Sequence, residues 1–313
     1  MSVKRMNSSS QSVGDRYDPV LIRICWLLNR VRASFVKTTW AVRQRLLEMG
    51  PRSRADLKTL CEIEEQIPEC RCYDQVTVMR QLRSVDLKKG YRSLEEYYEA
   101  VSTDPDSLSV MRENLTFIGT RFFRGGIWPE LRSVCESSFA GKDGGAVRVW
   151  CAGCSSGKEV YSILMVLLDI LPPERIEMLA TDYNAEVLRR CREATYPLVT
   201  LGEIPRKYWP YTERVPSSRE FRFQDSLRSM VQTGQLNLLT NGYPAGFDLI
   251  LCRNVVKFFR EEVRTDVQRK LARSLNPGGF LVVSDDLEHD GIKDPEASGL
   301  RQLDKSCIYV NQP

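Results

Sequence analysis

The sequence predicts an α/β protein in which a doubly wound, Rossmann-like domain follows an all-helical N-terminal domain. After residue 146, short apolar runs alternate with amphipathic segments, which is typical of strand and helix units around a mostly parallel sheet. Before residue 141, apolar side chains recur at helical spacing. The length of 313 residues, with 42% hydrophobic and 27% charged residues, suits one large domain with a smaller second one.

The first 140 residues divide into a leader and a helical domain. Residues 1–16 are polar and rich in serine, so we expect a disordered leader. In the helical domain, residues 17–140, apolar side chains at helical spacing between Pro19 and Met49 alternate with basic ones and predict helices with basic faces. Residues 1–60 hold twelve basic and four acidic residues, a net charge of +8, and the remainder carries −4.

Residues 50–89 are charged and carry weaker helical patterns, so we expect helices there. Ser93 and Glu96 have the spacing of a capping box and predict a helix over 94–101. A glycine-rich stretch marks the start of the α/β domain, residues 141–313.

Within the α/β domain, the spacing of apolar residues predicts the strands and helices, and glycine and proline mark the turns between them. We expect strands at 147–152, 176–181, 220–224, 248–252, 280–284 and 306–310, helices at 158–171, 186–194 and 261–275, and a turn at 276–279.

Composition excludes several classes of function. His289 is the only histidine, so catalytic triads, two-histidine metal motifs and histidine proton shuttles are disfavoured. A net charge of +4 gives no support for nucleic-acid binding. The N-terminus lacks an apolar signal sequence and no apolar run reaches membrane-spanning length, so we expect a cytoplasmic protein that does not insert into membranes.

The ten cysteines are irregularly spaced and are expected to be reduced thiols. Cys61, Cys70 and Cys72 lack a nearby histidine or fourth cysteine, so no metal site is expected. Cys151 and Cys154 have redox spacing, but packing of small side chains explains them better.

A glycine-containing turn after the first strand indicates a cofactor site. In the stretch Cys151 to Glu159, Gly153 lets the backbone approach a ligand, and the next helix offers free N–H groups. Asp182 ends the second strand, where it can accept hydrogen bonds from a ribose diol. The turn is not the dinucleotide G-x-G-x-x-G, which favours an S-adenosylmethionine (AdoMet) methyltransferase over a dehydrogenase. A purely structural tight turn remains the alternative.

Two further segments make the assignment specific. Arg253 and Asn254 follow an apolar strand, and Thr120-Arg121-Phe122-Phe123-Arg124 precedes the first strand. With these motifs the chain resembles the chemotaxis receptor methyltransferase family (CheR-type). The resemblance runs from about Ser93 to Tyr309 and includes T-x-F-F-R, A-x-x-x-G-x-E, the T-D acid, Asn237-Leu238-Leu239, C-R-N-V, L-x-P-G-G and Ile308-Tyr309.

The resemblance implies methylation of glutamates on bacterial chemoreceptors with AdoMet. It places Arg124 near the substrate carboxylate and Phe258 near the transferred methyl, where the family typically has a tyrosine. It also implies a small antiparallel β-subdomain at about 206–234. Receptor contacts from the basic helix would include Arg43 and Arg45, and we expect a monomer. The implied AdoMet contacts are Thr120, Arg124, Glu159, Asp182, Asn237, Leu238, Arg253 and Asn254.

The lone histidine agrees with this reaction. A glutamate side chain, with a reference pKa of about 4.3, is already ionised at neutral pH, so its attack on a sulfonium methyl needs no general base. The protein must align the reacting groups and partly desolvate the carboxylate.

Some positions depart from the family pattern: Ile118, Lys158, Phe258 and the stretch 284–289. The 50–89 segment is an insertion relative to the family. Two alternatives therefore stay open: a weakly active or non-catalytic module that binds AdoMet or receptors, and a methyltransferase for another substrate, such as RNA or a small molecule.

Overall fold

The computed structural model describes residues 54–73, 78–79, 81–82, 91, 93–108, 111, 120–141, 145–284, 291–304 and 306–312. The expected leader, the basic helices with Arg43 and Arg45, and the departures at Ile118 and 285–289 lie outside these residues.

A seven-stranded sheet with the order β6-β2-β1-β7-β8-β10-β9 forms the centre of the α/β domain. The first five strands in this order are parallel, whereas β10 runs antiparallel to β8 and β9. The winding reverses between β1 and β7, the switch point at which open α/β sheets bind ligands. The strands are β1 (Val147–Ala152), β2 (Ile176–Asp182), β6 (Val231–Gln235), β7 (Phe247–Leu251), β8 (Leu275–Val282), β9 (Leu300–Gln302) and β10 (Ile308–Asn311).

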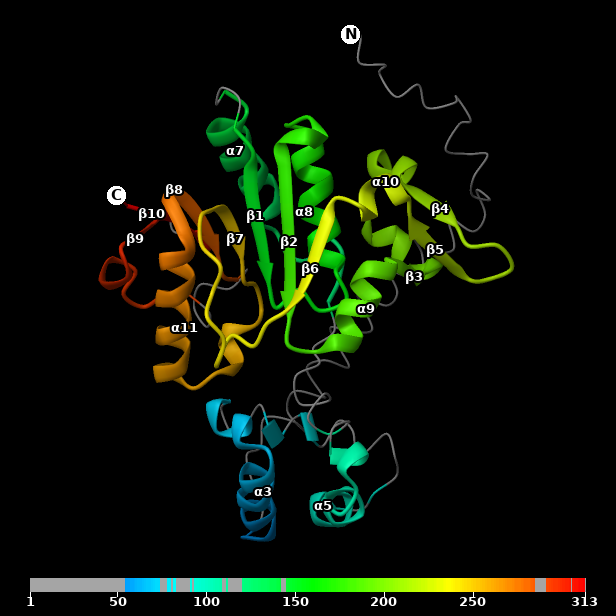
Figure 1. Ribbon diagram of the computed structural model, residues 1–313, viewed down its shortest axis with the longest axis vertical. Helices are drawn as coiled ribbons and strands as arrows, with labels where there is room; N and C mark the ends of the chain where they lie inside the picture. The colour runs from blue at the N-terminus through cyan, green and yellow to red at the C-terminus, as the bar shows by residue number, and fades with distance from the viewer. Residues whose placement is uncertain are drawn as a thin grey trace.

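Helices cover both faces of this sheet, which confirms the doubly wound fold class (Figure 1). Because side chains alternate along a strand, Val149 and Cys151 of β1 pack in the core with α7 and α8, whereas Trp150 packs in the core with α11. The helices are α7 (Trp128–Phe139), α8 (Lys158–Leu168), α9 (Ala185–Glu193), α10 (Asp225–Arg228) and α11 (Glu261–Ser274).

A separate three-stranded antiparallel sheet has the order β3-β5-β4, with β3 (Thr195–Pro197), β4 (Thr212–Arg214) and β5 (Glu220–Phe223). Its aromatic side chains, Tyr196, Phe221 and Phe223, surround Phe122 and join the core of the large sheet. The small sheet is thereby tied to the segment that precedes α7.

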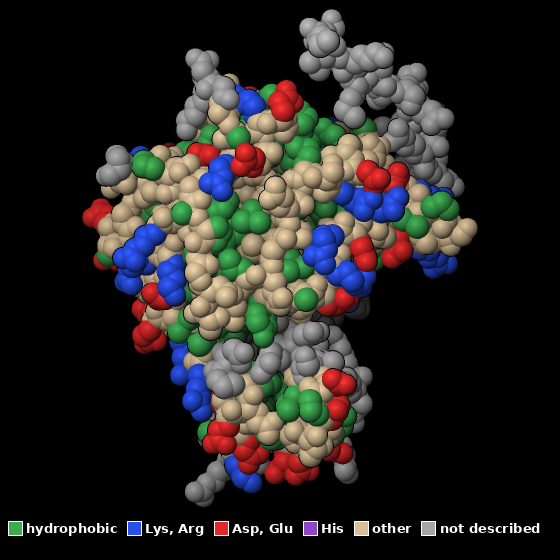
Figure 2. Space-filling model, viewed as in Figure 1, with side chains coloured by type: hydrophobic (Ala, Val, Ile, Leu, Met, Phe, Trp, Pro, Cys, Tyr) green, Lys and Arg blue, Asp and Glu red, His purple; other side chains and the backbone are tan. Residues whose placement is uncertain are grey.

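The N-terminal helices form their own hydrophobic cluster around Ile63, Met79 and Tyr97. This unit contains α3 (Arg54–Gln66) and α5 (Leu94–Ser102) and lies beyond the carboxyl ends of the central strands (Figure 1). Ser93 caps α5 by accepting the N–H of Glu96 at 3.1 Å, as the capping box predicts. Acidic side chains gather at the outer end of the unit (Figure 2).

Several element ends differ from the sequence prediction. The expected boundary at residue 141 falls after α7, a helix that packs into the core of the large sheet through Leu131, Cys135 and Phe139. The predicted turn at 276–279 is a bulge inside β8, where Gly278 has φ +76° and the pairing with β7 shifts register. The sequence pattern does not predict β3, β6 or β9. The small antiparallel sheet spans 195–223 rather than about 206–234, because residues 231–235 form β6 and pair with β2 in the large sheet.

Candidate functional site

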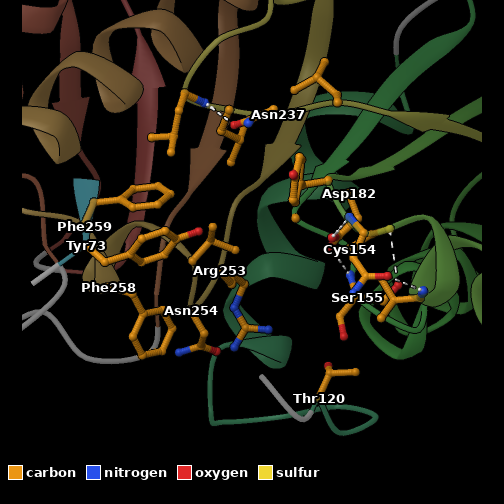
Figure 3. Close-up of a pocket in the computed structure, with 18 of the residues that line it drawn as sticks. Tyr73, Thr120, Cys154, Ser155, Asp182, Asn237, Arg253, Asn254, Phe258 and Phe259 are labelled. Carbon is orange, nitrogen blue, oxygen red and sulfur yellow. Dashed lines mark hydrogen bonds between the residues drawn. The ribbon is translucent and has the colours of Figure 1, made fainter. Parts of the chain in front are cut away.

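A cavity of about 1260 Å³, mouth included, lies at the carboxyl ends of β1, β2 and β7 (Figure 3). All ten described candidates line it: Thr120, Arg124, Gly153, Glu159, Asp182, Asn237, Leu238, Arg253, Asn254 and Phe258. Residues far apart in sequence meet here because parallel strands end at one edge of the sheet.

The turn after β1 requires glycine at residue 153. Gly153 has φ +74°, and a Cβ there would lie 2.5 Å from Cγ2 of Val255. The backbone N–H groups of Gly153 and Cys154 both donate to the carbonyl of Thr181, at 2.8 and 2.9 Å. The turn is thus fixed to the end of β2, and its backbone forms a wall of the cavity.

Asp182 links the two strand ends. Its Oδ2 accepts the N–H of Ser155 at 2.8 Å and its Oδ1 accepts the N–H of Asn184 at 3.0 Å. Burial raises the pKa of Asp182 above its ordinary value, while these backbone donors limit the rise. A carboxylate has about four acceptor sites, so Asp182 can still accept bonds from a diol.

Glu159 and Arg253 form an ion pair on one wall of the cavity. Nη1 of Arg253 lies 2.7 Å from Oε2 of Glu159, and the Arg253 side chain has no exposed surface (0%). Nη2 of Arg253 donates to the carbonyl of Arg124 at 2.8 Å, and the guanidinium packs 5.4 Å from the ring centroid of Trp128. Burial raises the pKa of Glu159, and Arg253 opposes this rise. The pair brings a cation and an anion to one wall.

The T-x-F-F-R segment is held by side chains rather than by a regular element. Glu203 accepts the N–H of Phe122 at 3.0 Å, and Ser162 accepts the N–H of Phe123 at 3.0 Å. Glu203 in turn lies 3.7 Å from Nζ of Lys158 and 3.6 Å from Nε of Arg121. Lys158, a departure from the family pattern, therefore helps to anchor this segment.

Phe122 and Phe123 both pack in the protein. Phe122 is 3% exposed, within the aromatic cluster of the small sheet, and Phe123 stacks on Tyr208 with centroids 5.6 Å apart. Core packing, which the sequence favours for at least one of them, holds for both.

The stretch after β6 adds an amide and apolar side chains to the cavity. Oδ1 of Asn237 accepts the N–H of Leu239 at 2.9 Å, and Tyr243 donates its hydroxyl to the carbonyl of Leu238 at 2.6 Å. Asn254, at the end of β7, adopts φ +58°, a left-handed conformation that is uncommon outside glycine and recurs at functional sites.

Lining residues that sequence reasoning did not single out include Ile67, Cys70 and Tyr73, which come from the N-terminal insertion. They lie about 190 residues before Phe258 and Phe259 in the chain, and no motif connects the two segments. Only the fold places them on one wall.

The cysteines near the turn are buried free thiols. A hydrogen bond with Cys191 and burial raise the pKa of Cys154, and burial raises that of Cys151. A raised pKa makes a thiol less reactive at neutral pH, in keeping with a packing role.

Comparison with known proteins assigns the family. The family model described as CheR methyltransferase, SAM binding domain, matches residues 119–294. This chain belongs to the CheR methyltransferase family. It is an AdoMet-dependent methyltransferase, and the resemblance found in its sequence motifs is confirmed.

Similar curated proteins carry consistent names. A chemotaxis protein methyltransferase of Listeria monocytogenes is 28% identical over 239 residues, covering 76% of this chain and 89% of the relative. A probable chemotaxis protein methyltransferase of Rhizobium etli is 31% identical over 213 residues, covering 62% and 77%. One from Salmonella typhimurium is 35% identical over 144 residues, covering 44% of this chain and 50% of the relative.

Within the described part of the chain, no helix is long and apolar enough to span a bilayer.

Proposed function

We propose that this CheR-family enzyme methylates glutamate side-chain carboxylates of bacterial chemoreceptors with AdoMet. The observation that carries the proposal is the cavity at the switch point, which gathers an acid at the end of β2, the Glu159–Arg253 ion pair and Arg124. The family and the names of its relatives support the same substrate class.

The lining residues fit AdoMet in three parts. Asp182 would accept hydrogen bonds from the ribose hydroxyls. Leu238 and Asn237 would offer an apolar surface and an amide to the adenine ring. The amino-acid end of AdoMet is a zwitterion, and Glu159, oriented by its ion pair with Arg253, would supply an anion for the ammonium group.

Bound AdoMet would supply an electrophilic sulfonium methyl: a glutamate carboxylate oxygen would form the O–CH3 bond as the S–CH3 bond breaks, which leaves S-adenosylhomocysteine and requires no proton transfer. The chain's task is therefore to orient and desolvate the substrate. Arg124 pairs with the substrate carboxylate and holds it at the cavity mouth. Phe258 excludes water beside the reacting groups. No histidine is required in these roles.

The receptor-binding surface lies in the N-terminal part of the chain. Arg43 and Arg45 belong to a strongly basic stretch that suits an acidic helical partner. We propose that the enzyme acts as a cytoplasmic monomer.

The cofactor assignment is tested by calorimetry of AdoMet binding to Asp182→Asn and Asp169→Asn. Asp182 lines the cavity, whereas Asp169 bonds Tyr208 and Arg132 outside it. We expect Asp182→Asn to weaken AdoMet binding by about tenfold, since a hydrogen bond to a charged group is worth about 1.5–3 kcal/mol, and Asp169→Asn to leave it unchanged. Equal AdoMet affinities for the two variants and the unaltered protein would refute the assignment of Asp182 to the cofactor site.

The substrate class is tested by offering labelled AdoMet together with receptor cytoplasmic domains, RNA or cell metabolites. Label on receptor glutamates supports the proposal. Label on RNA or a metabolite would show a different methyltransferase, and AdoMet binding without any transfer would show a non-catalytic binding module.

A further inference from the structure

The segment from Ile67 to Tyr73 forms one wall of the cavity. Ile67 and Cys70 are 2% exposed and belong to the core of the helical unit, yet both also line the cavity together with Tyr73. The N-terminal insertion therefore contributes directly to the site.

Backbone contacts fix Tyr73 against the α/β domain. Tyr73 forms an isolated antiparallel bridge with Phe259, and their ring centroids are 5.1 Å apart. The N–H of Arg260 donates to the carbonyl of Cys72 at 2.9 Å, and Nε of Arg260 donates to the carbonyl of Tyr73 at 3.2 Å. Nη2 of Arg260 also lies 3.6 Å from Oε1 of Glu64 in α3. Tyr73 thus has a defined position relative to β7.

The Tyr73 ring lies between those of Phe258 and Phe259, and its hydroxyl is directed into the cavity (Figure 3). Asp182 and Ser155 lie on the opposite side of the cavity (Figure 3). Phe258 and Phe259 have no hydrogen-bonding group on their side chains. Tyr73 therefore gives this otherwise apolar wall a phenolic donor.

We propose that the hydroxyl of Tyr73 donates a hydrogen bond to the carboxylate of the substrate glutamate and so determines specificity for a carboxylate. This inference rests on the proposed function. One carboxylate oxygen accepts the Tyr73 hydroxyl and the other stays available for the methyl. A rigid ring held by Phe259 loses little freedom when it makes this bond, which favours a single orientation of the substrate.

The test is Tyr73→Phe, which removes the hydroxyl and keeps the ring against Phe259. Tyr98→Phe serves as control, because the Tyr98 hydroxyl bonds the carbonyl of Glu62 within the same helical unit and does not line the cavity. Two readouts are used. One is the affinity for a receptor cytoplasmic domain in the presence of S-adenosylhomocysteine, and the other is steady-state methyl transfer. Each protein is given the receptor domain with glutamate or with glutamine at its modification sites.

For Tyr73→Phe we expect affinity for the glutamate form to fall about tenfold, because hydrogen bonds to charged groups are worth about 1.5–3 kcal/mol. Affinity for the glutamine form should fall only about threefold, or about 0.65 kcal/mol, because hydrogen bonds to neutral groups are weaker than those to charged groups. The kcat/KM for methyl transfer should fall in parallel with the affinity for the glutamate form. The affinity for S-adenosylhomocysteine should not change.

The proposal for Tyr73 is overturned if Tyr73→Phe behaves like Tyr98→Phe, or if it weakens binding of the glutamate and glutamine forms equally. If the unaltered protein binds S-adenosylhomocysteine but methylates no receptor glutamate, the proposed function itself fails, and the Tyr73 proposal fails with it. The first two outcomes leave the proposed function intact.

Discussion

At the residue scale, Gly153 and Gly278 allow the cost of a left-handed backbone to be measured apart from the cost of a steric clash. Gly153 and Gly278 adopt nearly the same φ, +74° and +76°, but a Cβ at Gly278 would meet no atom within 4 Å. We expect Gly278→Ala to reduce the free energy of unfolding by about 1 kcal/mol through strain alone, with unchanged AdoMet affinity. Gly153→Ala should destabilise further and weaken AdoMet binding by about tenfold, about 1.4 kcal/mol, because Val255 must move. Thermal unfolding and calorimetry measure both, and equal effects of the two variants would contradict this account.

The two buried carboxyls predict a pH dependence. Burial raises the pKa of Asp182 and Glu159. The folded protein therefore binds these protons more tightly than the unfolded chain does. The stability that they contribute falls as pH rises from their ordinary pKa values through the raised ones. Bound AdoMet, which carries an ammonium and a sulfonium charge, favours their ionised forms.

We therefore expect AdoMet to bind more weakly as pH falls from neutral through these raised pKa values. Binding at mildly acidic pH should release protons, which calorimetry in buffers of different ionisation heat can count. Glu159→Gln should reduce the number released. Affinity and proton release that do not change with pH would show that neither carboxyl faces the cofactor.

At the scale of elements, the sequence predicts best where burial dictates composition. β1 and β7 are apolar runs buried on both faces, so their residues identify them. β6 reads Val-Gln-Thr-Gly-Gln and lies at the edge of the sheet, where one side is solvated, so no apolar pattern marks it. β6 is a strand because its backbone pairs with β2, and its amino-acid composition does not indicate this.

In the candidate site, too, the sequence predicts only those residues that belong to a local pattern. Strand-end residues such as Asp182 and Asn254 are predictable, because the carboxyl ends of parallel strands converge. The pairing of Glu159 with Arg253 joins residues 94 positions apart, and the placement of Tyr73 depends on Arg260. Neither contact leaves a local pattern in the sequence.

Arg260 is expected to hold the Tyr73 segment in place. Arg260→Ala removes the bond to the Tyr73 carbonyl and the contact with Glu64, so hydrogen exchange over 67–73 should speed up by about fivefold, or about 1 kcal/mol. Arg269→Ala is the matched control, since both arginine side chains are 41% exposed and Nη1 of Arg269 lies 3.9 Å from Oδ1 of Asp266, within α11 and away from the Tyr73 segment. Exchange in β1 and β2 should stay unchanged in both. Identical exchange over 67–73 in the two variants would rule out this anchoring role.

At the scale of the whole molecule, basic and acidic side chains concentrate in different parts of the N-terminal region. The net charge of residues 1–60 is +8, whereas acidic side chains gather over the outer end of α3 and α5 (Figure 2). An acidic receptor helix should therefore meet the basic stretch between residues 19 and 49 rather than this acidic end.

Charge reversal tests that division. Arg43→Glu with Arg45→Glu should raise the KM for receptor domains by about tenfold and reduce the salt dependence of binding, without changing AdoMet affinity. Lys4→Glu with Arg5→Glu makes the same change of net charge in the expected leader and should have little effect. Equal effects of the two double variants would indicate net charge rather than a defined contact.

The central claim is methyl transfer from AdoMet to a receptor carboxylate. Methyl esters are labile to base, whereas methyl groups on nitrogen are not, so the most direct measurement is base-released labelled methanol from receptor cytoplasmic domains incubated with the enzyme and labelled AdoMet. We predict release that depends on time and enzyme and is lost when the receptor glutamates are replaced by alanine. Absence of volatile label, with AdoMet bound, would contradict the account.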